Sequence, residues 1–419
     1  MEEKYINLQA MHARVLSLEC WSSVVGAAAF NADCQSFLDR LKNYLTDVSV
    51  FKQKAVCVLV SDTDPKVTGM VTFTQGSVTT PVAITGQISG LSSGGHGFHI
   101  HEFGDLSKGC VTAGPHFNPT NKSHGGPNDS MRHVGDLGNV NAGADGVAEI
   151  EFTDKVIALN GLHNIVGRTL GVHKQKDDFG RGVGELEEES KTTGNAGPCL
   201  ACGVIGVGAG LNNYQILKEM HDRLLNTNQY WHFIVGGAGI EPNCKAFMEK
   251  IREYFTEDSA QQKAVCMLVS DTDPNVTGMV TFTQVSATTA VAITGRISGL
   301  SPGGHGFHVH EFGDLSKGCV TAGPHFNPTN KNHGGAVGDR RHIGDLGNVT
   351  PGSDGVARFD FLGHGISLSG PHNIVGRTLA VHAEKDDYGL GLGTSEEESK
   401  LTGNVGPCLA CGVIGIGAP

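Results

Sequence analysis

The chain has 419 residues, enough for two or three ordinary domains, and its 39% hydrophobic and 18% charged residues are typical of a globular protein. The net charge of −12 argues against a nucleic-acid partner, and at long range it would repel an anionic substrate unless a local positive field overrides it. Sixty glycines and only 6% aromatic residues indicate short strands joined by many turns.

The N-terminal region holds one candidate targeting signal, residues 15–32, which contains Ala27-Ala28-Ala29. Glu19 interrupts this apolar run, and two glutamates follow Met1 where a signal peptide would be basic. We therefore expect a cytoplasmic location, with an extracellular one as the alternative. No apolar run reaches the roughly 18 residues of a membrane span, so no membrane partner is expected.

The chain contains an internal duplication at an offset of 209 residues, so that Cys57 corresponds to Cys266 and His99 corresponds to His308. In each unit a helical segment precedes a β-rich segment. Phe37, Leu38, Leu41 and Leu45 share one helical face, and the second copy repeats the pattern. The expected organisation is an N-terminal helical extension (1–52), a first domain (53–210), a helical linker that repeats the extension (211–261) and a second domain (262–419).

Short alternating runs dominate the β-rich segments, beginning in the first unit with 55–60, 69–74 and 82–88. Turn residues separate these runs, which favours an all-β sandwich or barrel in each unit. Two long stretches, 104–135 and 174–198, lack strand character. Loops of this length inside a compact domain are usually functional.

Histidines cluster around a short motif that occurs in both units. His99 and His101 are two residues apart in an extended run, so both imidazoles face one space, and His308 with His310 repeats the arrangement. Further histidines and one aspartate follow in the same order in each unit. Imidazole suits copper and zinc, and three histidines with one aspartate make a plausible tetrahedral zinc site. The further residues are His116, His124, His133, Asp136 and His173 in the first unit, and His325, His333, His342, Asp345 and His382 in the second.

Four motifs in order give each unit a specific resemblance to copper/zinc superoxide dismutases: 97–104 (GFHIHEFG), 114–119 (GPHFNP), 133–139 (HVGDLGN) and 194–206. The resemblance covers about 155 residues of each copy. It implies a Greek-key β-sandwich or barrel and one copper and one zinc ion per domain. Electrostatic steering of the anionic substrate is a further property that the resemblance implies.

The resemblance also implies a role for each ligand residue. Copper would be bound by His99, His101, His116 and His173, and by His308, His310, His325 and His382. Zinc would be bound by His116, His124, His133 and Asp136, and by His325, His333, His342 and Asp345. His116 and His325 would bridge the two metals and carry a proton in the redox cycle, and Asp177 and Asp386 would tie the two ligand sets together.

Eleven cysteines leave at least one unpaired. The resemblance implies disulfides Cys110–Cys202 and Cys319–Cys411, and it leaves Cys57 and Cys266 as buried free thiols. The family's substrate-guiding arginine is replaced by Cys199 and, in the second copy, by Cys408. Lys191 and Lys400 lie about one position from the family's steering lysine, so the steering residues depart from the family's pattern at this position as well.

Three interpretations of Cys199 compete: a thiolate beside copper, a redox Cys-x-x-Cys pair with Cys202, or an extra disulfide. The cysteine count favours the third, with Cys34–Cys199 and Cys244–Cys408 as pairs and Cys20 left over. Extra disulfides would point toward an oxidising compartment.

The expected activity is conversion of superoxide to dioxygen and hydrogen peroxide at two sites, with weakened substrate guidance because arginine is absent. The alternative is a metal-binding or carrier protein on the same scaffold with little or no turnover. We also expect the two domains to pair as an intrachain pseudo-dimer. A copper chaperone is a candidate partner.

Overall fold

The computed structural model describes residues 53–76, 80–161, 163–209, 261–286, 289–338, 340–370 and 372–418. The expected helical extension and nearly all of the helical linker lie outside these residues, as do the candidate targeting segment 15–32 and Cys20, Cys34 and Cys244. Among the described helices, none is both long and apolar enough to cross a membrane.

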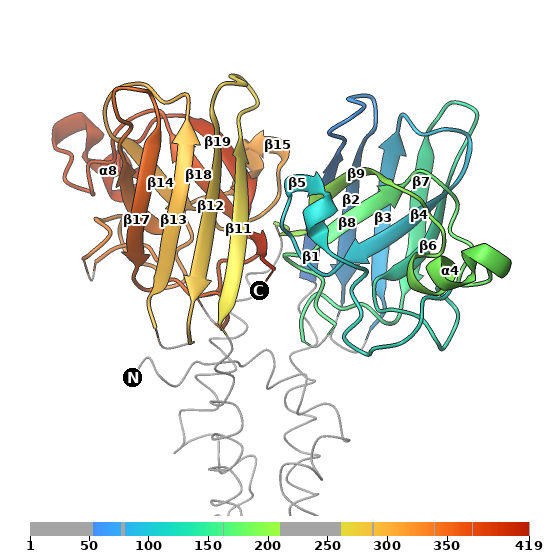
Figure 1. Ribbon diagram of the computed structural model, residues 1–419. Coiled ribbons are helices and arrows are strands. Elements are labelled where there is room, and N and C mark those ends of the chain that lie inside the picture. Colours follow the sequence, from blue (N-terminus) through green and yellow to red (C-terminus); the bar gives the residue numbers. More distant parts are fainter. Residues whose placement is uncertain are drawn as a thin grey trace, which may run out of the picture.

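The first domain is a nearly closed barrel of antiparallel strands in the order β6-β4-β8-β9-β1-β2-β3-β7, with β10 paired to β1 (Figure 1). The edge strands β6 and β7 lie next to each other, which almost closes the barrel. The expected all-β class is therefore confirmed. The bounds are β1 Gln53–Val60, β2 Thr68–Gln75, β3 Val82–Ser89, β4 Gly94–His101, β5 Ser107–Cys110, β6 Asp136–Ala142, β7 Ala148–Asp154, β8 Thr169–His173, β9 Cys199–Val204 and β10 Gly206–Val207.

The second domain repeats the topology in the order β16-β14-β18-β19-β11-β12-β13-β17, with β20 paired to β11. Its bounds are β11 Gln262–Val269, β12 Thr277–Gln284, β13 Val291–Ser298, β14 His305–Val309, β15 Ser316–Cys319, β16 Asp345–Val349, β17 Ala357–Gly363, β18 Thr378–His382, β19 Cys408–Val413 and β20 Gly415–Ile416.

Strand periodicity builds the core of each barrel. In β2, Val71, Phe73 and Gln75 are buried while the residues between them are partly exposed, as expected when successive side chains alternate between faces. Phe73 joins Phe98 and Ile84 in one buried apolar cluster. Burying one large apolar side chain contributes about 1.5–3 kcal/mol, so this cluster is a rigid base for the loops above it.

The two long loops contain short elements. The first carries the four-residue strand β5, which the sequence did not indicate, followed by a 3₁₀ turn at Val111–Ala113. The second carries the 3₁₀ turn Gly184–Leu186 and helix α4 (Glu187–Thr193). In the second domain the corresponding turns are Val320–Ala322 and Gly393–Ser395, and the helix is α8 (Glu396–Thr402).

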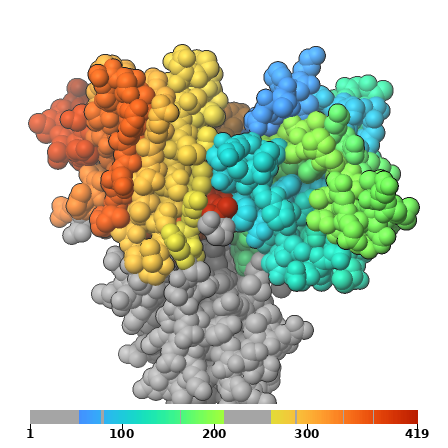
Figure 2. Space-filling model, in the orientation of Figure 1, coloured from blue at the N-terminus to red at the C-terminus, as the bar shows by residue number. Residues whose placement is uncertain are grey.

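The two domains lie side by side and touch (Figure 1, Figure 2). Four backbone hydrogen bonds of 2.7 Å join them: Gly104 N to Ile416 O, Ile416 N to Gly167 O, Gly313 N to Val207 O, and Val207 N to Gly376 O. These bonds form two equivalent pairs related by the 209-residue offset. The contact therefore has the self-complementary form of a two-fold dimer interface.

Candidate metal centres

Each barrel brings its predicted ligands together from four places in the chain, three strands and one loop. In the first domain β4 supplies His99 and His101, the end of β8 supplies His173, and the start of β6 supplies Asp136. The first long loop supplies the remaining three histidines. All seven side chains are buried, although loop residues are usually exposed. The structure thus gathers every ligand residue that the sequence singled out, and these atoms form two adjacent groups.

The first group surrounds one carboxylate oxygen. Oδ1 of Asp136 lies 2.9 Å from Nδ1 of His116, 3.0 Å from Nδ1 of His124 and 3.1 Å from Nδ1 of His133. The other oxygen, Oδ2, accepts hydrogen bonds from the backbone N–H groups of His133 and Gly125 at 2.7 and 3.2 Å. The backbone therefore fixes the carboxylate at the centre of three imidazole nitrogens.

This group suits a small divalent cation. Nε2 of His124 lies 2.8 Å from Oδ1 of Asp177, to which it donates in the neutral ring, and Nδ1 then carries a lone pair. That lone pair faces an oxygen of Asp136, and the two atoms do not form a hydrogen bond. Two electron-rich atoms in contact are stable when a cation lies between them, and a His₃Asp set is a tetrahedral zinc donor set.

The second group contains His99 and His173 and shares His116 with the first, and His101 borders it through His173. Nδ1 of His101 donates to the carbonyl of Gly114 at 2.8 Å, and Nδ1 of His173 donates to the carbonyl of Gly197 at 2.9 Å. Their Nε2 atoms therefore both carry lone pairs, yet they face each other at 3.3 Å. Nδ1 of His99 is also buried without a partner. These unpaired nitrogens are what a copper ion would require.

Asp177 connects the two groups. Its Oδ2 accepts from Nε2 of His99 at 2.9 Å, and its Oδ1 accepts from Nε2 of His124. Asn139 holds this aspartate through two hydrogen bonds, one to its backbone N–H (2.8 Å) and one to its carbonyl (2.9 Å). The sequence motifs assigned Asn139 no role of its own. The sequence feature that could have identified Asn139 is its position at the end of the third motif, three residues after Asp136.

Burial sets the protonation of the metal-free site. It lowers the pKa of His99 well below its usual value, and it lowers the pKa of His101 to about 3 and that of His173 to about 4, with neighbouring imidazoles adding to the effect. His124 differs: burial is outweighed by the nearby carboxylates of Asp136 and Asp177, which raise its pKa to about 9. Imidazoles that stay neutral are ready to bind a metal, because the metal takes the unprotonated nitrogen.

The second domain repeats this geometry. Three Nδ1 atoms lie 3.0–3.2 Å from Oδ1 of Asp345, and Asp386 accepts from His308 and His333 at 2.9 and 2.7 Å. Nε2 atoms of His310 and His382 face each other at 3.3 Å. Both copies therefore contain a complete donor set.

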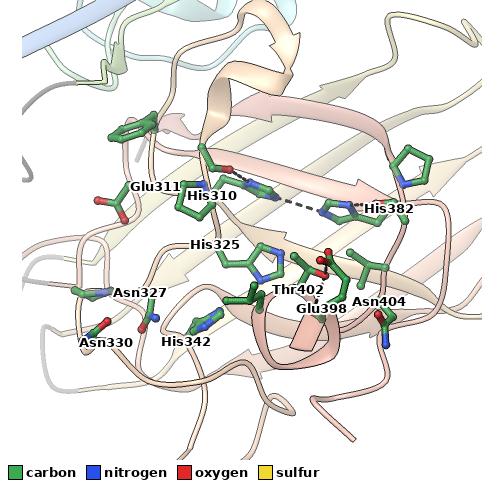
Figure 3. Close-up of a pocket in the computed structure, with 18 residues that line it drawn as sticks. His310, Glu311, His325, Asn327, Asn330, His342, His382, Glu398, Thr402 and Asn404 are labelled. Atoms are coloured by element: carbon green, nitrogen blue, oxygen red, sulfur yellow. Dashed lines mark hydrogen bonds between the residues drawn. The ribbon is translucent and has the colours of Figure 1, made fainter. Parts of the chain in front are cut away.

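A cleft opens over the second centre (Figure 3). His310, His325 and His382 lie in it, and the carboxylates of Glu311 and Glu398 lie on its wall. None of the described residues that line the cleft is a lysine or an arginine. The side chain of Lys400 instead contacts Glu396 at 2.6 Å on the exposed helix α8.

The structure pairs the cysteines differently from the sequence-based prediction. Cys110 is bonded to Cys199, not to Cys202, and Cys319 is bonded to Cys408, not to Cys411. Cys202 and Cys411 are buried free cysteines, as are Cys57 and Cys266. In this arrangement Cys199 and Cys408 have partners other than the expected Cys34 and Cys244, which lie outside the described residues. The physical reason is a shift of register in β9 and β19, which turns Cys199 and Cys408 toward these partners.

Comparison with known proteins relates both halves of the chain to one family. The family model for copper/zinc superoxide dismutase matches residues 67–205 and 276–414. The Cu-Zn superoxide dismutase of Onchocerca volvulus is 51% identical over 155 residues, covering 37% of this chain and 96% of that protein. The extracellular Cu-Zn superoxide dismutase of Brugia pahangi is 52% identical over 155 residues, covering 37% of this chain and 76% of that protein. A crystal structure of the clock protein EA4 is 44% identical, with a TM-score of 0.35 and coverage of 38% of this chain and 96% of that one.

Each of the two barrels holds two groups of candidate metal ligands that have one histidine in common. The fold and these sites define the class of the chain as a metalloprotein of the oxidoreductase type with two tandem domains. The chain belongs to the copper/zinc superoxide dismutase family, and it carries the family's domain twice.

Proposed function

We propose that the chain dismutates superoxide at two centres, one in each domain. The observation that carries this proposal is that each copy gathers two groups of candidate donors that share one imidazole, His116 in the first copy and His325 in the second. The copper ligands would be His99, His101, His116 and His173, with His308, His310, His325 and His382 in the second domain. The zinc ligands would be His116, His124, His133 and Asp136, with His325, His333, His342 and Asp345.

Copper, when bound, supplies the one-electron chemistry that oxidises one superoxide to dioxygen and reduces a second to hydrogen peroxide; zinc has no redox chemistry. The shared imidazole is placed to handle protons. Nδ1 of His116 is held against Asp136 at 2.9 Å, so its other nitrogen, Nε2, is the atom that can hold or release a proton toward the cleft. His325 is held by Asp345 in the same way, at 3.1 Å.

Substrate guidance is weak in this proposal. Superoxide is an anion, and a fixed guanidinium at the cleft would attract and orient it. Here the corresponding positions hold Cys199 and Cys408, and two glutamates lie on the described wall of the second cleft. Capture of the substrate should therefore be slow relative to a centre with an arginine at this position.

A superoxide assay coupled to xanthine oxidase tests the proposal on protein loaded with copper and zinc. We expect activity above that of free copper, with a rate that changes less with ionic strength than a steered reaction would. The Cys199→Arg/Cys408→Arg variant should be faster, and Cys199→Ser/Cys408→Ser is its control for loss of the sulfur. Full metal occupancy with activity no higher than free copper would reject the enzyme.

The second candidate is a metal carrier with little turnover. It is favoured by the cleft of the second domain, whose described lining holds two glutamates and neither lysine nor arginine. A carrier should pass copper to a competing chelator quickly from the oxidised protein while showing no dismutation. An enzyme should retain copper through many turnovers. Copper retention and the superoxide assay, measured on the same sample, separate the two.

We also propose that the two domains act as an intrachain pseudo-dimer, supported by the four symmetric hydrogen bonds between them. A copper chaperone would be a transient partner during loading. For location, a cytoplasmic site is our proposal and an extracellular one the alternative, since two relatives are named extracellular. Secretion of a tagged full-length chain, or its retention, decides this.

A further inference from the structure

The first domain holds three cysteines in one place, and only two of them are bonded. Sγ atoms of Cys110, Cys199 and Cys202 all lie within 4.8 Å of one another. Cys110 and Cys199 form the disulfide, and Cys202 is 3% exposed and carries a free thiol. A thiol this close to a disulfide is placed to attack it.

A distortion of β9 makes this cluster possible. Residues three apart in a regular strand point to opposite faces, so Cys199 and Cys202 should not meet the same partner. The register between β8 and β9 shifts, however: Val172 pairs with Ala201, while His173 pairs with Cys199. Leu200 is the extra residue of a bulge, which turns Cys199 to the face that Cys202 occupies. β19 has the same shift, between Val381–Ala410 and His382–Cys408.

Cys110 is the common partner of the other two sulfurs. It ends β5, opposite β9, with its Cα 6.3 Å from that of Cys199. Three strand residues span about 10 Å, and a disulfide needs Cα atoms within about 7 Å, so a direct bond between Cys199 and Cys202 is disfavoured. Two pairings are therefore available to each domain, Cys110–Cys199 and Cys110–Cys202.

We propose that this cluster is a thiol–disulfide exchange site that alternates between these two pairings. Sγ of Cys202 loses its proton and attacks Sγ of Cys110; the Cys110–Cys199 bond breaks as the Cys110–Cys202 bond forms. Sγ of Cys199 leaves as a thiolate and takes up a proton. One disulfide and one thiol are present before and after, so no outside oxidant or reductant is required. The inference does not depend on the proposed activity.

Exchange changes what lies beside the candidate copper ligands. A Cβ atom built on Gly171 would lie 3.3 Å from Nε2 of His101 and 3.5 Å from Sγ of Cys199, so both atoms border one small space. In one pairing that space is bordered by a disulfide sulfur, and in the other by a thiol, which is a far better ligand for copper. The pairing therefore sets the chemistry at the edge of the centre.

The exchange should be slow at neutral pH. Burial raises the pKa of the Cys202 thiol to about 12, and the nearby Asp62 adds to this effect. Because the thiolate is the nucleophile, its supply below that pKa rises about tenfold for each pH unit. The buried thiol of Cys202 therefore stays protonated and does not attack the neighbouring disulfide until it ionises.

Trapping of Cys199 tests the proposal on the full-length oxidised protein. Cys199 is partly exposed and Cys202 is buried, so N-ethylmaleimide added to the native protein should capture Cys199 each time exchange frees it. Trypsin leaves both cysteines in one peptide (192–218), so the label is located by fragment ions between them. We expect labelled Cys199, a Cys110–Cys202 disulfide in the same molecules, and faster labelling at pH 9 than at pH 7.

Cys202→Ser is the matched control. It leaves Cys110, Cys199 and every other cysteine in place but removes the attacking thiol, so labelling of Cys199 should fall at least tenfold. The second domain of the same molecule, with Cys411 intact, reports that the chain is folded, and Cys411→Ser reverses the roles. Equal labelling of Cys199 with and without Cys202 overturns the proposal. So does a single pairing in the wild-type protein that persists through prolonged incubation with the reagent at pH 9.

Cys199→Ser provides a second, equilibrium test that needs no trapping. If Cys202 can reach Cys110, this variant should form Cys110–Cys202 on air oxidation and retain its fold. Free thiols at both positions in folded, oxidised protein would show that the second pairing is out of reach, and would also overturn the proposal.

Discussion

One aspartate in each domain holds the two candidate metal groups in register. The two oxygens of Asp177 accept from His99 and His124, one imidazole from each group. Each bond fixes which ring nitrogen carries the proton and leaves the other free. Asn139 fixes the aspartate in turn, so the donor geometry rests on a chain of buried hydrogen bonds rather than on the ligands alone.

Asp177→Asn should weaken zinc binding by the first domain about 10–100-fold. An amide presents one acceptor and one donor, so it cannot accept from both imidazoles, and one ring loses its orientation. Competition with a chromophoric zinc chelator measures the loss. The second domain, with Asp386 intact, is the internal control, and equal affinities in both domains would contradict this role.

Acid should destabilise the metal-free protein between about pH 6.5 and 4. Burial lowers the pKa of four histidines in each domain, so the unfolded chain, with values near 6.5, takes up these protons first. The free energy of unfolding therefore falls as the pH falls through this window. The histidines with lowered pKa are His99, His101, His116 and His173, with His308, His310, His325 and His382.

Other groups act outside that window. His124 and His333 have pKa values raised to about 9, so they stabilise fully below about 6.5 and lose that contribution as the pH rises through 9. Asp136 and Asp345 have lowered pKa values, because burial is outweighed by three imidazoles in contact with each carboxylate, and their contribution is lost only below about pH 4. Urea unfolding of chelator-treated protein at pH 7, 6, 5 and 4 measures the slope. A constant midpoint would be the contrary result.

At the scale of elements, the barrel strands supply a rigid base and the two long loops close over it. The second loop returns to the centre at the end of α4, where Gly194 has φ of +66°. A Cβ atom there would lie 1.9 Å from Oδ1 of Asp177 and 2.4 Å from Nε2 of His124. The helix end therefore packs directly on the hydrogen bond that joins the two metal groups.

Gly194→Ala should displace Asp177 and lower both zinc affinity and thermal stability. Gly184→Ala is a matched control, because its φ of +67° imposes the same backbone strain, about 1 kcal/mol, while nothing lies within 4 Å of its added Cβ. Zinc titration and thermal unfolding of both variants separate the effect of the steric clash with Asp177 from the effect of the backbone strain. Equal effects would show that the contact with Asp177 is unimportant.

On the scale of the whole molecule, the duplication places both halves of a two-fold interface on one chain. The backbones approach closely at β10 and β20, where a Cβ atom on Gly206 would lie 2.0 Å from the carbonyl oxygen of Gly313, and one on Gly415 would lie 2.1 Å from that of Gly104. Only glycine permits these contacts and the hydrogen bonds beside them.

Gly206→Ala/Gly415→Ala should separate the domains without unfolding either barrel. Small-angle X-ray scattering should show a larger radius of gyration, and thermal unfolding should lose cooperativity between the domains. Gly76→Ala is the control, because its added Cβ would meet only Thr80 at 3.6 Å. An unchanged radius of gyration would mean that the interface tolerates the extra methyl groups.

The sequence was sufficient for the duplication, the all-β class and the set of residues that gather at each centre. These features depend on local pattern: period-two alternation puts His99 and His101 on one face, and the same ligand order recurs 209 residues later. The residues that support the ligands, such as Asn139 and Gly194, were not identified, because their role depends on which side chain the returning loop meets.

The disulfide partner was decided only by the tertiary structure. The alternation of side chains along a regular strand would place Cys199 and Cys202 on opposite faces. Nothing in residues 199–204 indicates that Leu200 is the extra residue of a bulge. A bulge arises where two strands must accommodate different lengths, which is a property of the pairing between β8 and β9 and not of either strand. The sequence by itself therefore determined which imidazoles and carboxylates gather at each centre; the register of the folded sheet determined which sulfur lies beside them.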